Sequence, residues 1–425
     1  MAEDLLFSGN ARFVTHNRQV VATNQFVGEW IRFSEECYRY LLQAMEAGFS
    51  RSAFLACFRD RDDRLYMEKL LRGLESIKVL ADSEQLEKEK EVSLRSVTLM
   101  LTNRCNLSCR HCAANAADGT KRDFLSTAAI KGIIDKVMVC HPESIILTGG
   151  EPLIRKDFLE ILRHIVSYGE ARVVVMTNAT LITPLMAKEL AGCVESVDIS
   201  LDGFDEESCC GIRGKGVFDR VLRSISLLQQ NGLDKISLSM VSLGRDQAAE
   251  KKFHDLCEGL RVKPVVRRLS YTGRAKENEE YFDGREKEQR ICDRHLPSEQ
   301  QIKSVMKACS CRAGVETLNV SDTGEIYPCG TFDGEMDSLG NMMEIESVRK
   351  FLEEQRQRVS RNAEKFYRYL PYKGDICADC CVRYFCWTCP YAALDRLEKS
   401  HKLAAYCAGQ KAFLSRMVWG EECHG

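Results

Sequence analysis

Three cysteines lie close together in the run TNRCNLSCRHC at 102–112, where Cys105, Cys109 and Cys112 have the spacing C-x3-C-x2-C. Thiolates are soft ligands that bind zinc ions and iron–sulfur clusters. Three of them on one short loop can hold three irons of a four-iron, four-sulfur cluster and leave the fourth iron without a protein ligand. Taken alone, the spacing also leaves open a zinc site or a set of buried thiols.

The surroundings of this loop favour the cluster, because the loop directly follows an apolar, strand-like run, SVTLML at 96–101. Gly149-Gly150-Glu151-Pro152 follows the next such run. Paired glycines let a backbone come close to a ligand, and Glu151 supplies a carboxylate for an ammonium group. With both motifs at strand ends, the chain resembles the radical S-adenosylmethionine (radical SAM) superfamily. The resemblance implies that the open iron chelates S-adenosylmethionine and that an electron from the cluster splits it to give an adenosyl radical.

The bulk composition bounds the remaining possibilities. A chain of 425 residues can hold two or three domains, and its net charge of -2 argues against nucleic acid as a general partner. There is no signal-peptide pattern and no apolar run long enough for a membrane, so no membrane partner is expected. The 21 cysteines, several in C-x2-C spacing, therefore favour metal binding in a reducing compartment, and a cytoplasmic location is expected.

The N-terminal residues carry a small winged-helix pattern. Ser34 can cap a helix whose apolar positions repeat with helical spacing until Gly48 ends it. Short strands are expected at 12–15, 18–23 and 29–33, further helices at 52–58 and 64–74, and a returning strand at 77–80.

Two kinds of partner suit such a module. A DNA-reading face needs excess lysine and arginine, but the run RDRDDR at 59–64 is charge-balanced. The segment instead resembles the precursor-peptide recognition element of peptide-modifying radical SAM enzymes. That resemblance implies that a leader peptide adds to an exposed strand edge. A packing domain without a peptide partner is the alternative.

Between 96 and about 271 the sequence alternates strand-like and helical runs, and this predicts an α/β fold. Strands are expected at 96–101, 144–147, 172–176, 196–200, 235–241 and 262–269, and helices at 126–139, 157–167, 184–190, 217–230 and 247–256. Repeated β-α units form a parallel sheet with right-handed crossovers. Six strands suit a partial (β/α)6 TIM barrel.

In such a barrel the chemistry lies at the C-terminal ends of the strands, and the distinctive polar residues follow one strand end after another. The sixth strand leads to Tyr271, Gly273 and Arg274. The resemblance implies contacts between the cofactor and residues at the other strand ends. His111 would lie near the adenine, Gly149, Gly150 and Glu151 at the methionine ammonium, Asn178, Ser200 and Asp202 near the ribose or methionine, and Arg213 at the carboxylate. For Asn178, Ser200, Asp202 and Arg213, a turn or cap role is the alternative.

The C-terminal region contains a second set of ordered cysteines, which is a strong metal signal. After an upstream radical SAM core, this order resembles the SPASM extension, which holds auxiliary iron–sulfur clusters; zinc is the alternative. The resemblance implies one cluster on Cys311, Cys329 and Cys389, with Cys309 as a further candidate ligand, and a second on Cys377, Cys380, Cys386 and Cys407.

These observations predict a domain order and a function. The expected domains are a winged-helix precursor-peptide recognition element at 1–82, a charged linker at 83–95, the radical SAM partial barrel at 96–274, a bridge at 275–306 and a SPASM domain at 307–425. The resemblance implies S-adenosylmethionine, three 4Fe-4S clusters and a flavodoxin- or ferredoxin-type electron donor.

The favoured function is a maturase that makes cysteine sulfur-to-carbon thioether bonds in a ribosomally made precursor peptide. A carbon–carbon cross-linking maturase is the close alternative, and a formylglycine-type sulfatase maturase is a weaker one. A DNA-binding iron–sulfur sensor and a zinc-stabilised scaffold are the non-enzyme alternatives.

Overall fold

The computed structural model describes residues 4–84, 86, 91, 93–120, 122–242, 247–269, 272–283, 306–332, 338–357, 375–386 and 400–420. Cys389 and Tyr271, which the sequence analysis singles out, lie outside these residues. The chain forms two compact units. The first contains 1–92, 291–312 and 364–425, and the second contains 93–290 and 313–363.

The first unit begins with a three-stranded antiparallel sheet in the order β2-β3-β4. Its elements, with the short pair β1 and β5, are β1 (Leu6–Phe7), β2 (Ala11–His16), β3 (Gln19–Asn24), β4 (Trp30–Ser34), α1 (Glu35–Glu46), α2 (Arg51–Ala56), α3 (Arg61–Ser76) and β5 (Leu80–Ala81). The Ser34 hydroxyl accepts a hydrogen bond from the Cys37 amide, 3.2 Å away, and so caps α1. These bounds confirm the three strands predicted between 12 and 33 and the three predicted helices, whereas the strand predicted at 77–80 overlaps β5 only at Leu80.

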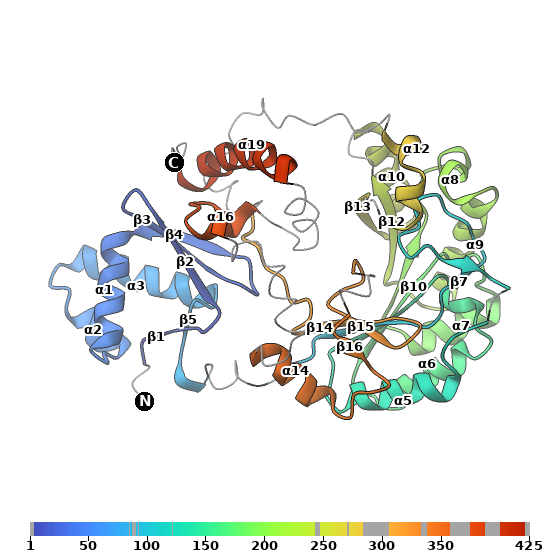
Figure 1. Ribbon diagram of the computed structural model, residues 1–425, viewed down its shortest axis with the longest axis horizontal. Coiled ribbons are helices and arrows are strands. Elements are labelled where there is room, and N and C mark those ends of the chain that lie inside the picture. The colour runs from blue at the N-terminus through green and yellow to red at the C-terminus, as the bar shows by residue number, and fades with distance from the viewer. Residues whose placement is uncertain are drawn as a thin grey trace. The chain divides into compact units, whose positions relative to one another are not determined.

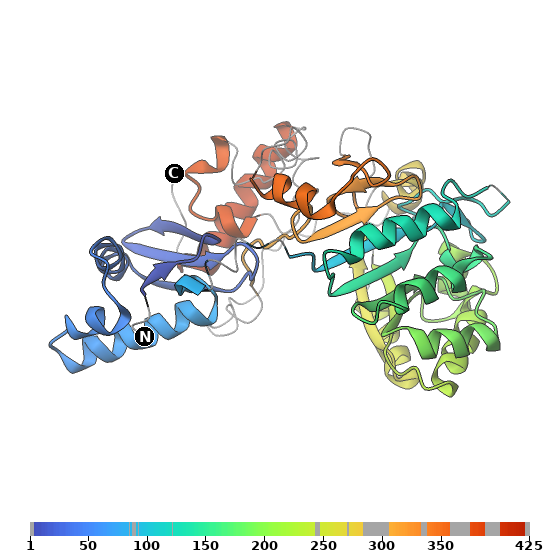
Figure 2. The ribbon, with the colours of Figure 1, turned by 90° about the horizontal axis from the view of Figure 1, so that it is seen from below.

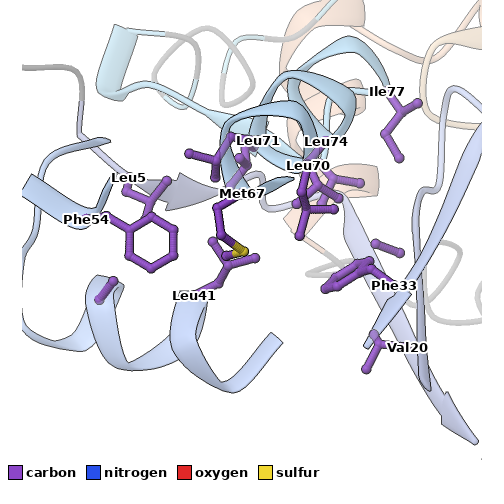
Figure 3. Close-up of a cluster of buried hydrophobic side chains, with 14 residues drawn as sticks. Leu5, Val20, Phe33, Leu41, Phe54, Met67, Leu70, Leu71, Leu74 and Ile77 are labelled. Atoms are coloured by element: carbon purple, nitrogen blue, oxygen red, sulfur yellow. The ribbon is translucent and has the colours of Figure 1, made fainter. Parts of the chain in front are cut away.

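One face of this sheet packs on the three helices. Alternate residues of a strand point to opposite faces, so Val20 and Ala22 of β3 enter the core shared with the helices. Leu71 and Leu74 of α3 are fully buried in the same core. Figure 3 shows this cluster, with Phe33 of the sheet among the labelled side chains.

The other face of the sheet packs on the C-terminal part of the chain. Val21, between Val20 and Ala22, belongs to a second core with Trp30 and with residues of α17 (Arg383–Cys386) and α19 (Ser400–Trp419). The Trp30 ring meets the edge of Phe385 at 5.3 Å between ring centres. In Figures 1 and 2 the blue sheet accordingly lies between the helices α1 to α3 and the red C-terminal helices. The short helix α16 (Asp375–Ala378) precedes this region.

The second unit is built on a nine-stranded sheet in the order β13-β12-β11-β10-β9-β6-β14-β15-β16. Its six consecutive parallel strands are β6 (Ser96–Met100), β9 (Ser144–Thr148), β10 (Arg172–Thr177), β11 (Ser196–Ser200), β12 (Ile236–Ser242) and β13 (Lys263–Arg268). They confirm the six predicted strands. The sheet ends at β13 and β16 rather than closing, as a partial barrel requires.

Helices cover the outside of these strands (Figure 1). They are α5 (Thr127–Met138), η1 (Pro152–Ile154), α6 (Phe158–Val166), α7 (Pro184–Cys193), α8 (Glu206–Arg213), α9 (Val217–Gln230) and α10 (Gln247–Leu260), followed by α11 (Arg274–Glu277), α12 (Glu279–Asp283) and α14 (Val348–Gln357). The central strands bury every second residue completely, for example Ile145 and Leu147 of β9, and leave their neighbours half-buried on the other face. No helix in the described residues is long and apolar enough to cross a membrane.

Three further strands extend the sheet beyond the predicted barrel. β14 (Thr317–Val320) pairs in parallel with β6, and β15 (Glu325–Tyr327) and β16 (Gly340–Asn341) follow antiparallel. The two short strands β7 (Arg104–Cys105) and β8 (Ala117–Asp118) pair with each other across the cysteine loop. The residues after the predicted barrel thus belong partly to the same sheet.

Candidate active site

The cysteine loop and the glycine loop are in direct backbone contact at the ends of β6 and β9. The amide of Gly150 donates to the carbonyl of Thr102 at 2.8 Å, and the amide of Glu151 donates to that of Arg104 at 2.8 Å. A Cβ atom on Gly149 or Gly150 would lie 2.3 Å from one of these two carbonyl oxygens. Gly149 also has φ 152, which side chains disfavour. The glycine pair is therefore required because the two loops touch.

Glu151, which follows β9, is fully buried and is hydrogen-bonded to residues at the end of β10. Its carboxylate accepts hydrogen bonds from the Thr177 hydroxyl at 2.7 Å, the Asn178 amide at 2.7 Å and the Leu153 amide at 3.0 Å. Burial raises the pKa of this carboxyl, and the three donors oppose that shift. A carboxylate has about four acceptor sites, so one of them is left for the predicted methionine ammonium.

All three cysteine sulfurs are hydrogen-bond acceptors. The Leu107 amide lies 3.4 Å from the Cys105 sulfur, and the Ala116 amide lies 3.4 Å from the Cys112 sulfur. The sulfur of Cys109 accepts from the guanidinium of Arg213 at 3.8 Å. Hydrogen bonds to sulfur stabilise thiolates, so this donor set fits the expected iron–sulfur cluster.

Cys105 and Cys109 would be thiols until they bind a metal. Burial raises the pKa of Cys105 to about 11 and also raises the pKa of Cys109. Cluster ligands must be deprotonated, so cluster binding releases their protons. In the described part of the chain, no three His, Cys, Asp or Glu residues converge on one metal ion. Cysteines that hold a cluster bind separate irons and need not converge in that way.

Asn178, which follows β10, contacts the cysteine loop at Cys105 and Asn106. Its side-chain amide lies 3.8 Å from the Cys105 sulfur and donates to the side-chain oxygen of Asn106 at 3.0 Å. Its own side-chain oxygen accepts from the amide and the hydroxyl of Thr180 at 2.9 and 2.6 Å. Ser200 ends β11 opposite Ser239 of β12 and is half-buried. The structure thus places Asn178 against the cysteine loop and Ser200 at the end of β11.

Asp202 links three elements in a buried ion-pair network. Its carboxylate lies 2.7 Å from the Nε2 atom of His111 and 2.6 Å from the Nε atom of Arg213, and it accepts from the Val241 amide at 2.6 Å. Burial alone would raise the pKa of Asp202, but the positive charge of Arg213 and the contact with His111 lower it overall. The carboxylate stays ionised and orients both partners, and Arg213 in turn reaches Cys109.

Arg274, which follows the last parallel strand β13, holds the cysteine loop through three hydrogen bonds. Its side chain donates to the carbonyls of Cys109 at 3.0 Å and Ala116 at 2.7 Å, and its amide donates to the carbonyl of Cys112 at 3.0 Å. The preceding Gly273 has φ 52, and a Cβ there would lie 2.4 Å from the Cys112 carbonyl oxygen. The sequence places Arg274 at a strand end but gives no sign of this role, since its partners lie about 160 residues earlier.

The segment after Arg274 is also part of the site. Ala275 and Phe282, in the stretch predicted to be a bridge between domains, are buried. The guanidinium of Arg110 lies over the Tyr281 ring, 4.4 Å from its centre, and the Asn278 side chain donates to the Arg110 carbonyl at 3.3 Å. The segment therefore contacts the cysteine loop at Arg110, through the ring of Tyr281 and the side chain of Asn278.

The C-terminal cysteines are distributed over both units. The second unit contains Cys329. The first unit contains the other described cysteines of the predicted set, which are Cys309, Cys311, Cys377, Cys380, Cys386 and Cys407. Burial raises the pKa of Cys386 to about 12, with further contributions from the neighbouring thiols of Cys407, Cys380, Cys309 and Cys377. Five thiols are thus close enough to interact electrostatically in the first unit, and Cys309 lies beside the predicted second set.

Comparison with known proteins agrees with this geometry. Residues 99–257 match the profile of the Radical SAM superfamily. The AdoMet-dependent heme synthase of Methanosarcina barkeri is 30% identical over 268 residues, which cover 56% of this chain and 76% of that protein. The mycofactocin maturase MftC of Mycobacterium tuberculosis is 34% identical over 194 residues, which cover 45% of this chain and 48% of the relative. The chain thus spans about half the length of MftC.

Among solved structures, that of Streptococcus suis SuiB bound to the precursor peptide SuiA aligns with 90% of this chain and 94% of SuiB. The TM-score is 0.53 at 18% sequence identity, so this likeness concerns the fold. SuiB bound to S-adenosylmethionine aligns with a TM-score of 0.52. The family match implies S-adenosylmethionine and one 4Fe-4S cluster as cofactors. By its cysteine loop, its partial barrel and its sequence relatives, the chain belongs to the radical SAM superfamily.

Proposed function

We propose that this chain is a radical SAM maturase that recognises a ribosomally made precursor peptide through its N-terminal module. The observation that carries the proposal is the three-stranded sheet in which β4 is an edge strand among the described residues. An extended peptide can add to such an edge through backbone hydrogen bonds. The alignment with SuiB, whose structure contains a precursor peptide, covers 90% of this chain and so extends beyond the radical SAM core.

The proposed reaction joins a cysteine sulfur to a carbon of the same peptide. One S–H and one C–H bond break and one S–C bond forms, so the peptide loses two electrons and two protons. A cluster held by Cys105, Cys109 and Cys112 would cleave bound S-adenosylmethionine reductively and so supply the acceptor for one hydrogen atom. The remaining proton is released to solvent, and the remaining electron needs a second acceptor. A cysteine-held auxiliary cluster is suited to accept that electron.

Within the chain, the proposed roles are as follows. Cys105, Cys109 and Cys112 hold the radical SAM cluster, and Arg274 orders their loop. Asn178, Ser200 and the network of Asp202, His111 and Arg213 line the strand ends where the cofactor binds. The C-terminal cysteines, including Cys309, Cys311, Cys329 and the set around Cys386, hold the auxiliary clusters, with Cys389 as a further predicted ligand.

The test is mass spectrometry of short peptides encoded beside this chain, after anaerobic incubation with the reconstituted enzyme, S-adenosylmethionine and a reductant. A loss of two hydrogen masses together with loss of one alkylatable cysteine is expected. The same mass loss with every cysteine still alkylatable would replace the thioether by a carbon–carbon bond. Formation of deoxyadenosine without any change in the peptides would contradict the peptide substrate.

A second candidate function follows from the relatives. The heme synthase match covers 76% of that protein, and the Fe-coproporphyrin III synthase of Methanosarcina barkeri is 33% identical over 209 residues. A tetrapyrrole substrate would need no peptide-binding edge strand. Incubation with Fe-coproporphyrin III under the same conditions separates the two functions, because only a tetrapyrrole-modifying enzyme would change the absorption spectrum of the porphyrin.

A further inference from the structure

A cavity of about 370 Å³ in the second unit is lined partly by the cysteine loop. It is formed between residues of 106–110 and residues of 210–220, and no aspartate or glutamate lines it. Four of its lining residues are cationic: Arg110, Arg213, Lys215 and Arg220. We propose that this cavity, hereafter the basic cavity, is where an acidic electron-carrier protein docks to reduce the cluster. The inference rests on the proposed cluster at Cys105, Cys109 and Cys112.

The positive charge of the basic cavity is largely uncompensated. Arg213 is neutralised by Asp202, with which it forms a buried ion pair. Arg110 and Lys215 are exposed, and within the described residues neither they nor Arg220 pair with a carboxylate. A concave surface with one sign of charge focuses the field and speeds the approach of an oppositely charged partner. The surface therefore suits a partner with an acidic face.

The walls of the basic cavity connect directly to the cluster loop. Arg110 follows Cys109 in the chain, and its amide donates to the carbonyl of Ile212 at 3.1 Å. Arg213 lines the cavity, and its guanidinium contacts the Cys109 sulfur at 3.8 Å. A carrier seated on this surface would thus meet a residue that itself contacts a cluster ligand.

The cavity is also held in a fixed shape. The Arg110 guanidinium stacks on Tyr281, and the Tyr281 hydroxyl donates to the carbonyl of Gly211 at 3.4 Å. The Nε atom of Arg220 donates to the Gly216 carbonyl at 2.9 Å. Cations that are already positioned lose little side-chain entropy when a partner binds. A preformed basic surface beside a redox centre is thus better explained by docking than by simple solubility.

The step itself transfers one electron. A flavodoxin in its hydroquinone state loses one electron and becomes the one-electron-oxidised flavin, while the cluster held by the three cysteines gains that electron. No bond is formed or broken between the two proteins. Because the partner only approaches and leaves, the rate of this step should depend on ionic strength.

The experiment is stopped-flow reduction of the reconstituted holoenzyme, followed by the visible absorbance of its iron–sulfur clusters. The test variant is Lys215→Glu/Arg220→Glu. The control variant Lys188→Glu/Lys251→Glu changes the net charge by the same amount on helices α7 and α10 of the same unit, away from the cavity. Each protein is reduced by flavodoxin hydroquinone and, separately, by reduced methyl viologen, which is a small cation and needs no acidic docking face.

At low ionic strength we expect the test variant to lose about tenfold or more in its rate with flavodoxin, and the control variant to keep its rate. The difference should shrink at about 0.5 M salt, where charges are screened within a few ångströms. The viologen rate should not fall in either variant. Equal flavodoxin rates in all three proteins would overturn the docking site while leaving the cluster intact.

Two other results would also overturn it. If the test variant keeps its flavodoxin rate but needs more of an acidic precursor peptide for half-maximal modification, the basic cavity binds peptide instead of the carrier. If reconstituted protein shows no cluster absorbance at all, the proposed cluster itself fails. The rate of reduction by flavodoxin therefore tests the docking site, and the cluster absorbance tests the proposed cluster.

Discussion

Replacement of Arg274 by methionine tests whether a residue 160 positions away orders the cysteine loop. The Arg274 side chain donates to the carbonyls of Cys109 and Ala116, while its backbone amide donates to Cys112. Methionine removes both side-chain bonds but retains the backbone bond and much of the apolar stem. The loop then keeps one of its three contacts with this residue.

The expected magnitude follows from those two bonds. A hydrogen bond from a charged donor contributes about 1.5–3 kcal/mol, and Arg274 is half-buried, so the lower end applies to each. The loss is then about 3 kcal/mol. Because about 1.4 kcal/mol corresponds to a factor of ten, iron should be held about a hundredfold less tightly by the loop. Arg274→Lys keeps the charge but cannot reach both carbonyls with one ammonium, so an intermediate loss is expected.

The assay is the decay of cluster absorbance when the anaerobically reconstituted protein is challenged with an iron chelator. A variant that retains only the auxiliary clusters, with Cys105, Cys109 and Cys112 all changed to alanine, provides the background. The matched control is Arg223→Met, because Arg223 is an exposed arginine of α9 whose one side-chain hydrogen bond within the described residues goes to the Asp219 carbonyl in its own helix.

The reasoning is refuted if Arg274→Met loses iron no faster than Arg223→Met. Thermal unfolding of each metal-free variant guards against another explanation. A large fall in the unfolding temperature of Arg274→Met alone would show that Arg274 supports the whole barrel. In that case the Arg274→Lys variant decides whether the loop is affected independently of the barrel. An intermediate rate of iron loss in the chelator assay would show that it is.

Three further substitutions test the loop contact, the buried ion pair and the strand link. Gly150→Ala should destabilise the cluster loop by about 2 kcal/mol or more in the chelator assay, because the added Cβ would lie 2.3 Å from a carbonyl oxygen. The control is Gly132→Ala in helix α5, where a Cβ would meet no atom within 4 Å. This control should raise the unfolding temperature slightly. Asp202→Asn should lower the free energy of unfolding by about 3–5 kcal/mol, since it leaves the buried Arg213 unpaired, and an unchanged urea midpoint would contradict this. The folded-state pKa of Asp202 is lowered, so its contribution is present above the ordinary aspartate pKa of about 3.9 and is lost as the pH falls, whereas the variant should lack that acid sensitivity. Glu151→Gln should cost about 1–3 kcal/mol in urea unfolding, because an amide group would face one of three hydrogen-bond donors, and a stability equal to that of the parent would argue against the link.

Much of the core fold could be predicted because its signals are local. The central parallel strands alternate buried apolar residues with half-buried ones over about five positions, as in Ser196–Ser200, and the helices between them have an apolar stripe with helical spacing. The helix cap at Ser34 was predictable for the same reason, since a cap bonds an amide only three residues away. The strand and helix bounds therefore agree within a few residues.

The sheet extension could not be predicted in this way. β14 is only four residues long and pairs with β6 about 220 residues earlier. A short strand has little periodicity, and its pairing depends on which edge of the barrel remains open. The same holds for the N-terminal sheet, where Val21 and Trp30 are covered by C-terminal helices that no local pattern links to them.

By itself, the sequence determined the chemistry that this protein can perform: three closely spaced thiols, a glycine pair and polar residues at successive strand ends, in a β-α order that brings those ends together. Only the tertiary structure decided how these groups are held. The glycine pair touches the cysteine loop, Glu151 bonds the third strand end, and Arg274 reaches back across the barrel. The physical reason is that residue type and spacing fix local conformation, whereas a hydrogen bond between distant segments exists only once packing has brought a donor to its acceptor.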